Sequence, residues 1–179
     1  MGVNLERDEI LFFPLLYWPI TPQQREIGDK ALAKVDAFMK SGGLILFDTR
    51  DQELGGFGGA RLGASSQQLR RLLGRLDVPP LIPVPADHVL TKTFYLLQEF
   101  PGRYTGGQVW VERNPGGGSD GVSGMVIGAH DWAAAWAIDN DGRPLAALVP
   151  GGARQREFAY RFGVNLVMYT LTGNYKSDQ

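Results

Sequence analysis

Residues 10–47 read ILFFPLLYWPITPQQREIGDKALAKVDAFMKSGGLILF, and this stretch decides the fold. Two short apolar runs, residues 10–13 and 44–47, are typical of strands that are buried on both faces. Between them, apolar side chains recur at helical spacing, at Ile27, Ala31, Val35, Phe38 and Met39. A helix that joins two fully apolar strands predicts a right-handed crossover, and therefore a parallel pair of strands.

The boundaries of these elements follow from their turn residues. Pro14 is predicted to end the first strand, which leaves residues 15–19 as an aromatic loop at its carboxyl end. Thr21 as a cap, Pro22 at the first helical position and Gln24 in a capping box predict that the helix begins there. Gly42 and Gly43 predict its end, because glycine accepts the left-handed conformation that follows a helix.

The rest of the chain continues the alternation of helices and strands and predicts an α/β fold. We expect a helix from the capping box at 65–68 to Pro79. One face of this helix is apolar, with Leu69, Leu72, Leu73 and Leu76, and the arginines Arg70, Arg71 and Arg75 are expected to be solvated. After it we expect regular structure near 94–97, a strand at 108–112, a turn-rich loop at 114–121, a strand at 125–127, a helix opened by His130 and Asp131, and a last helix at 154–172. Residues 164–171 are apolar nearly all round, which predicts that the last helix is largely buried.

Composition excludes several classes of function. The 179 residues carry a net charge of −1, which argues against a nucleic-acid binder that neutralises many phosphates. There is no cysteine and there are two histidines, so disulfides, thiolate metal sites and multi-histidine metal sites are excluded. No apolar run reaches the roughly 18–20 residues that span a bilayer, so we expect no membrane insertion by this chain, and we expect no cofactor.

One candidate site directly follows the second predicted strand, at Asp48, Thr49, Arg50 and Asp51. Ligands of open α/β sheets bind outside the carboxyl ends of the strands, so these side chains are placed to meet a ligand. The structural alternative is that Asp48 and Asp51 accept hydrogen bonds from backbone amides and pair with Arg50.

A second candidate site is the strand-to-helix junction at His130, Asp131 and Trp132. A helix N-terminus favours anions and lowers the pKa of a nearby histidine. The structural alternative makes Asp131 a helix cap and Trp132 a core residue. His88 follows Asp87 in a proline-rich connection, and a hydrogen-bonded structural histidine is its alternative. If the histidines converge on Asp48 or Asp51, a hydrolytic or single-metal site results.

Several strings taken together resemble one family along nearly the whole chain. They are FFPLLYWP at 12–19, GG at 42–43 with LFDTRD at 46–51, DHVL at 87–90 with FYLL at 94–97, Gly128 with DWAAAW at 131–136, and RFGVN at 161–165 with TGNYK at 172–176. This combination resembles the bacterial family catalogued as domain of unknown function 4159.

The resemblance implies a fold and a setting. The family is similar in fold to class I glutamine amidotransferases and ThuA-like proteins, which implies a flavodoxin-like three-layer sandwich with a mainly parallel central sheet. It implies that residues 1–179 form a single amidotransferase-like domain, the carboxyl-terminal part of a longer, membrane-anchored protein. The domain itself would be soluble and tethered to the bacterial inner membrane through that parent. Components of a MoxR-type ATPase system are the implied partners.

The resemblance does not carry amidotransferase activity, because that chemistry needs a cysteine nucleophile and the chain has none. It transfers no catalytic residue. We therefore expect a non-catalytic domain that binds a small ligand or a protein partner at the carboxyl edge of its sheet. Two alternatives stay open: a hydrolase, carbohydrate-directed or with one metal, that uses Asp48 or Asp51 with His88 or His130, and a structural assembly domain of a membrane-linked complex.

Overall fold

The computed structural model describes residues 2–54, 56–58, 61–113 and 122–173. It has a mixed α/β fold built on one five-stranded sheet. The strands in spatial order are β1 (Leu15–Pro19), β2 (Leu44–Asp48), β5 (Met125–Gly128), β4 (Trp110–Glu112) and β3 (Leu81–Pro83). The pairs β1–β2 and β2–β5 are parallel, and β4 and β3 add an antiparallel edge. The sheet is therefore parallel at its centre and along β1, but not throughout.

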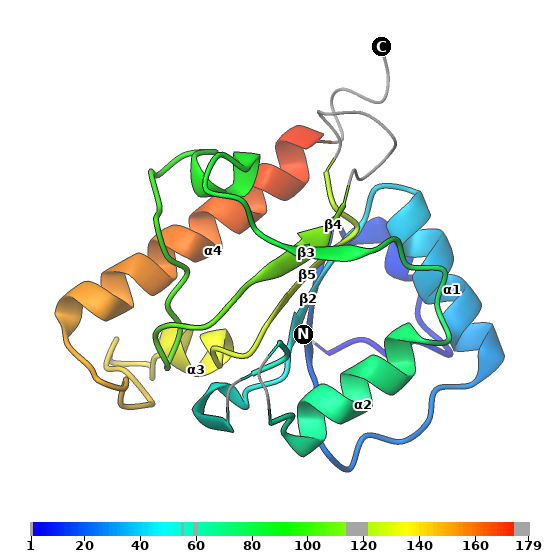
Figure 1. The fold of residues 1–179 in the computed structure, drawn as a ribbon, viewed down its shortest axis with the longest axis horizontal. Coiled ribbons are helices and arrows are strands. Elements are labelled where there is room, and N and C mark those ends of the chain that lie inside the picture. Colours follow the sequence, from blue (N-terminus) through cyan, green and yellow to red (C-terminus); the bar gives the residue numbers. More distant parts are fainter. Residues whose placement is uncertain (1, 55, 59–60, 114–121, 174–179) are drawn as a thin grey trace.

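Helices cover both faces of the sheet (Figure 1). The helices α1 (Asp29–Lys40) and α2 (Ala64–Leu73) lie on one face, and α3 (Trp132–Trp136) and α4 (Ala153–Gly173) lie on the other. Alternate residues of β2 serve the two faces, since Ile45 and Phe47 pack with the first pair and Leu44 and Leu46 with the second. All five residues of β2 are buried, as its continuous apolar run predicts.

The predicted parallel pair is confirmed, but the predicted position of its first strand is wrong. Residues Ile10–Phe12 form a 3₁₀ turn, with Ile10 buried and Phe12 84% exposed. The strand is β1, which was expected to be a loop. Pro14 precedes the strand rather than ending it, and its carbonyl accepts a hydrogen bond from the Leu44 amide. A proline lacks only a donor, so it is tolerated just before a strand.

The helix α1 also begins later than predicted, at Asp29 rather than near Thr21. Thr21 and Gln24 form a single turn, and the Gln24 side chain accepts a hydrogen bond from the Trp18 indole instead of completing a capping box. The predicted end is confirmed: the helix stops at Lys40, and Gly42 adopts a φ of 93°.

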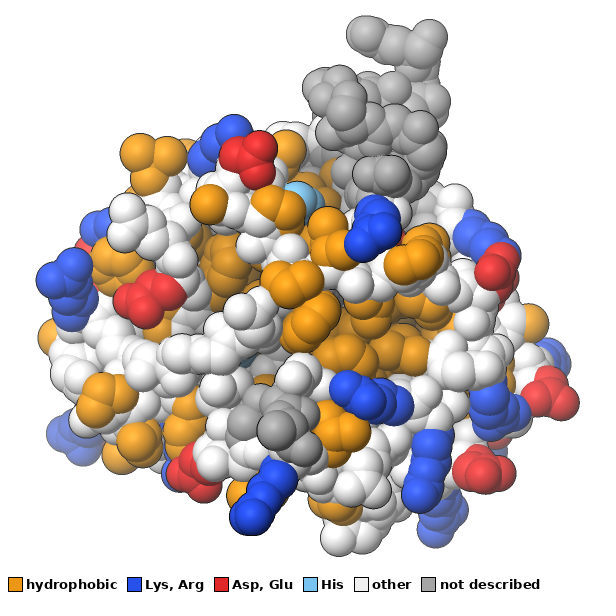
Figure 2. Space-filling view, viewed as in Figure 1, with side chains coloured by type: hydrophobic (Ala, Val, Ile, Leu, Met, Phe, Trp, Pro, Cys, Tyr) orange, Lys and Arg blue, Asp and Glu red, His pale blue; other side chains and the backbone are white. Residues whose placement is uncertain are grey.

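The second helix departs from its predicted boundaries at both ends. It begins at Ala64 after Gly63, and no side chain of its own caps it. It ends at Leu73, well before Pro79. Its buried face is confirmed at Leu69 and Leu72. Arg70, Arg71 and Arg75 are exposed, and Figure 2 shows Lys and Arg side chains over this helix.

The long connection between β3 and β4 holds no helix or strand at 94–97, where regular structure was expected. Its one regular turn in the described residues is the 3₁₀ helix η3 (Val89–Thr91). Asn165 of α4 secures this connection by accepting a hydrogen bond from the Tyr95 amide and donating to the Tyr95 and Leu90 carbonyls. The strand predicted at 125–127 is confirmed, and the one predicted at 108–112 is confirmed as the shorter β4. The loop predicted at 114–121 lies outside the described residues.

The last helix has the predicted span, but the expectation that it is largely buried is wrong. Phe162, Leu166 and Tyr169 are buried against the sheet, whereas Val164 and Val167 are 40% and 45% exposed. The apolar residues surround the helix, and only one side of it meets the core. Among the described residues, no helix combines the length and the apolar character that crossing a membrane requires.

Candidate functional site

The carboxyl ends of β2 and β5 lie side by side at the centre of one sheet edge. Asp48 is in register with Gly128, and the Thr49 amide donates to the Gly128 carbonyl at 2.9 Å. The chain leaves β2 toward α2 on one face and leaves β5 toward α3 on the other. The structure therefore brings the two predicted clusters, Asp48–Asp51 and His130–Trp132, to one place.

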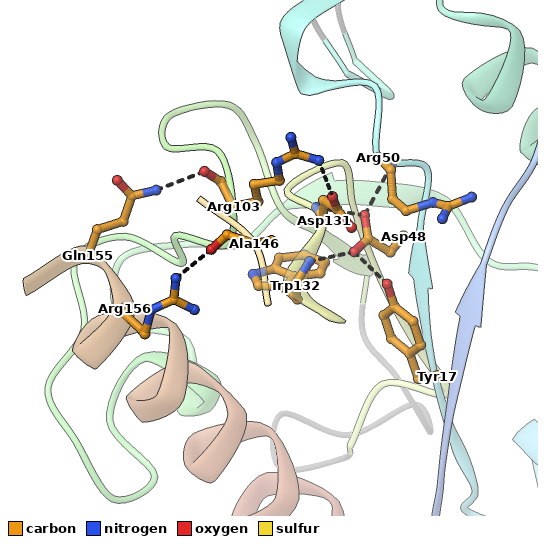
Figure 3. Close-up of polar contacts among 9 residues, drawn as sticks. All are labelled: Tyr17, Asp48, Arg50, Arg103, Asp131, Trp132, Ala146, Gln155 and Arg156. Atoms are coloured by element: carbon orange, nitrogen blue, oxygen red, sulfur yellow. Dashed lines mark hydrogen bonds and ion pairs between the residues drawn. The ribbon is translucent and has the colours of Figure 1, made fainter. Parts of the chain in front are cut away.

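Asp48 is the centre of this junction (Figure 3). Its carboxylate is fully buried and accepts four hydrogen bonds. One oxygen takes the amides of Arg50 (3.1 Å) and Asp131 (3.2 Å), and the other takes the Trp132 amide (2.8 Å) and the Tyr17 hydroxyl (3.0 Å). Asp48 thus supplies the acceptor at the start of α3, a role that the Asp131 side chain does not perform.

Burial dominates the ionisation of this group. It raises the pKa of Asp48 to about 6, and the hydrogen bonds from Trp132, Tyr17, Asp131 and Arg50 oppose that rise. Burial, with the Asp48 charge beside it, also raises the pKa of the Tyr17 hydroxyl well above its ordinary value. At neutral pH, Tyr17 is therefore a hydrogen-bond donor to an ionised Asp48.

Replacing Asp48 by asparagine tests this capping role. An asparagine side chain has one accepting oxygen and one donating NH₂ group, so two of the four donors around Asp48 lose their acceptor. Each orphaned buried donor costs about 1–3 kcal/mol, and the removal of a buried charge offsets part of that. We expect Asp48→Asn to lower the free energy of unfolding at pH 7 by about 2 kcal/mol in urea denaturation. Tyr17→Phe, which removes one donor and keeps the carboxylate, should cost about half as much; no loss in Asp48→Asn contradicts the role.

Asp51 performs the equivalent task for the helix on the opposite face. Its carboxylate accepts hydrogen bonds from the Ser66 amide (3.1 Å), the Ser66 hydroxyl (2.9 Å) and the Thr49 hydroxyl (2.5 Å). It lies against Gly63, where a Cβ would overlap the carboxyl group. The two aspartates therefore cap α3 and α2 from one loop, as the structural alternative predicted, but neither pairs with Arg50.

Two residues with strained backbones flank the junction. Arg50 follows β2 with φ 56° and Asp131 follows β5 with φ 54°, and among the described residues these are the non-glycine residues with positive φ. Such conformations cost about 1–3 kcal/mol each and cluster at ligand-binding sites. Arg50 is exposed, and within the described part of the chain its side chain donates a hydrogen bond to the Ile20 carbonyl, at 3.4 Å. Asp131 pairs with Arg103 at 3.4 Å.

His130 and Trp132 are core residues rather than open contacts for a ligand. The His130 side chain is buried, its Nε2 lies 2.6 Å from the Gly106 carbonyl oxygen, and its ring stacks on Trp132 with centroids 4.8 Å apart. Since that oxygen can only accept, Nε2 carries the proton. Burial lowers the pKa of His130 to about 4, so the ring is neutral at pH 7.

The structure does not bring His88 to the junction. Its ring packs 5.6 Å from that of Tyr169, near the end of α4, and its Nδ1 accepts a hydrogen bond from the Leu90 amide. His130 lies beside the segment that Gln155 holds at the start of α4. Tyr169 and Gln155 are roughly 21 Å apart along the helix, at about 1.5 Å per residue.

The residues matched by a known family cover most of the chain. A family model described as Domain of unknown function (DUF4159) matches residues 1–171. The chain belongs to this family. No curated protein matches it.

For this member of the DUF4159 family, no histidine–carboxylate hydrogen bond and no group of three metal-ligating side chains exist within the described residues. The ring nitrogens of His130 contact backbone groups, and the carboxylates of Asp48 and Asp51 are occupied by helix amides. The hydrolase hypothesis depends on a hydrogen bond between a histidine and a carboxylate, and the described residues do not form one.

One residue of the junction, Arg103, is not predicted by the sequence of this DUF4159 chain. Arg103 comes from the proline-rich connection, and its guanidinium meets Asp131 from the far side of the junction. Gln155 of α4 fixes this segment, since its side-chain amide donates to the Gly102 carbonyl at 2.9 Å and to the Arg103 carbonyl at 3.0 Å. Figure 3 shows the second of these contacts. No motif or spacing marks Arg103, because only the folded connection places it there.

Proposed function

We propose that this domain is a non-catalytic binding module that holds a small anionic ligand between the ends of β2 and β5. The observation that carries the proposal is the divergence of two connections at this point: the connection after β2 passes to one face of the sheet and the connection after β5 to the other. Between two such strands the loops diverge and leave a crevice, and ligands of open α/β sheets bind there.

The side chains that the junction exposes support an anionic ligand. The carboxylate oxygens of Asp48 and Asp51 accept hydrogen bonds from donors inside the protein, so neither carboxylate is presented to a ligand, although hydrogen bonding does not remove its charge. Arg50 is exposed, and no ion pair joins it to a carboxylate of the described residues. Arg103 adds a second guanidinium, whose side chain is 39% exposed. Guanidinium groups bind carboxylates and phosphates through charge-assisted, often bidentate hydrogen bonds.

The same contacts support binding rather than catalysis. The backbone amides of Arg50, Asp131 and Trp132 resemble the donors that could stabilise an oxyanion, but the Asp48 carboxylate already occupies them. A ligand at this edge would therefore meet side chains of Arg50 and Arg103 and a rigid frame behind them.

A binding experiment with a matched arginine control tests the proposal. Inorganic phosphate, citrate and ATP serve as probes, and the melting temperature is followed against probe concentration for the wild type, Arg50→Gln and Arg71→Gln. We expect a saturable rise for at least one probe in the wild type and in Arg71→Gln, whose arginine is exposed on α2. In Arg50→Gln, binding should weaken by about tenfold or more. Equal responses in all three proteins, or no response to any probe, contradict the proposal.

The finer assignment of fold, setting and partner is part of the same proposal and rests on the family resemblance. The resemblance supports a flavodoxin-like, amidotransferase-like sandwich, and helices on both faces of the sheet are compatible with it. It also supports a domain tethered to the bacterial inner membrane through a parent protein, with a MoxR-type ATPase system as the partner. Co-purification of the parent protein with such an ATPase is the direct test.

A further inference from the structure

A long apolar groove runs between β1 and α4, on the sheet edge opposite β3. It has a volume of about 440 Å³, and Leu15 and Tyr17 of β1 line one wall while Gly163 and Val167 of α4 line the other. Trp136 lies across from Tyr17, with ring centroids 6.2 Å apart. Every described residue that lines this groove is uncharged. A monomer leaves this surface in water.

The outer side of α4 extends the groove. Tyr160, Val164, Val167 and Leu171 are 40%, 40%, 45% and 47% exposed. Their spacing of four, three and four residues puts them on one helical face, which we call the α4 stripe. The stripe is roughly 16 Å long at about 1.5 Å per residue, and the five residues of β1 span about 17 Å at 3.3 Å per residue. The stripe and the strand therefore match in length.

The outer edge of β1 has free backbone groups. Among the described strands, β1 pairs only with β2. The Pro14 carbonyl and the Ile20 amide bond to β2, and backbone groups alternate along a parallel strand, so the even-numbered residues face β2. The odd-numbered residues direct their backbone outward: Leu15 and Tyr17 present an N–H and a C=O, and Pro19 presents a C=O. An unpaired edge of this kind is a template for another strand.

This edge is complementary to itself. In an antiparallel pair with each Leu15 opposite the Tyr17 of the other copy, each Leu15 N–H donates to the other Tyr17 C=O, and each Tyr17 N–H donates to the other Leu15 C=O. This makes four hydrogen bonds in total. Pro19 then lies beyond the paired residues and ends the ladder, because its ring occupies the position of an outward N–H. The Leu15 and Tyr17 side chains of each copy enter the groove, because they already point to that face.

The charge pattern favours the same occupant. A two-fold contact places each residue near the axis against its own copy, so a charged side chain there would face a like charge. Where the structure describes them, the groove and the α4 stripe carry no charged residue. We propose that this chain forms a two-fold dimer in which the β1 edges pair antiparallel and the two α4 stripes cover the paired β1 strands. The dimer does not depend on the ligand proposed at Arg50.

Sedimentation equilibrium of the purified chain between about 1 and 500 μM tests the dimer. We expect a concentration-dependent monomer–dimer equilibrium, and Val167→Lys should weaken it by at least tenfold. Leu171→Lys, near the end of α4, is a second variant in case the first does not fold. Leu54→Lys is the matched control, because Leu54 is exposed apolar surface outside the groove, and it should dimerise like the wild type.

Amide exchange separates strand pairing from any other contact. In the wild type at high concentration, the Leu15 and Tyr17 amides should exchange at least tenfold more slowly than in monomeric Val167→Lys. A wild type that stays monomeric at the highest concentration overturns the proposal and leaves the groove for a different protein partner. A dimer that persists in the stripe variants, or one whose two amides exchange as fast as in the monomer, overturns it as well.

Discussion

Replacing Trp132 by alanine is expected to lower the free energy of unfolding by about 4 kcal/mol, the largest loss of any single change at the junction. The Trp132 side chain is fully buried. Its ring packs on His130 and Phe162, each with centroids 4.8 Å apart, and its N–H donates to the Phe100 carbonyl at 3.1 Å. Alanine leaves a cavity and an unpaired carbonyl. Urea denaturation, followed by circular dichroism, measures the loss.

Gly128 provides the control for this effect. A Cβ on Gly128 would overlap the six-membered ring of Trp132, so Gly128→Ala should itself cost about 1–3 kcal/mol by overpacking. Trp132→Phe removes the overlapped atoms, so the cost of Gly128→Ala should fall in that background. A double-mutant cycle measures this coupling. If the losses of Gly128→Ala and Trp132→Phe simply add, the Trp132 ring does not pack tightly against the end of β5.

The sequence predicts the centre of the fold because there local pattern and burial agree. The run at 44–47 is buried on both faces of the sheet, as expected for a strand that lies between two layers of helices. At 10–19 two apolar runs compete for one strand, and the pattern alone favours the wrong one. The second run wins because its alternate residues reach both layers: Leu16 and Trp18 pack with α1 and α2, and Leu15 and Tyr17 pack toward α4.

The candidate site shows a different limit. The parallel pair places Asp48 and the Asp131–Trp132 turn at one edge, and that much follows from the order of the elements. What Asp48 does there depends on amides 83 and 84 residues away in sequence, which no local pattern encodes. Arg103 arrives from a connection with no regular structure, so its place is fixed only by contacts such as those of Gln155.

The stability of the junction is expected to fall as the pH decreases from about 6.5 to about 4, because His130 must stay neutral to remain buried. Burial lowers the pKa of His130 to about 4 in the folded state, against 6.5 for an exposed histidine. Between pH 4 and pH 6.5 His130 is protonated in the unfolded chain but neutral in the folded chain, so a fall in pH favours unfolding. The contribution of His130 is complete above pH 6.5, and about 3 kcal/mol of it is lost by pH 4.

A variant that cannot titrate isolates this contribution from that of Asp48. The raised pKa of Asp48 acts in the opposite sense, since a carboxyl with a folded pKa of about 6 gains stability as the pH falls below that value. His130→Gln keeps a donor for the Gly106 carbonyl, and its stability should rise relative to the wild type as the pH falls. The comparison needs unfolding free energies from pH 4.5 to 8 for both proteins.

His88→Gln is the control, because His88 is only half-buried and its replacement should change the pH dependence of the unfolding free energy less. Parallel pH profiles for wild type and His130→Gln would mean that the ring is not held neutral, and the dry, stacked contact with Trp132 would then not be what stabilises this end of β5.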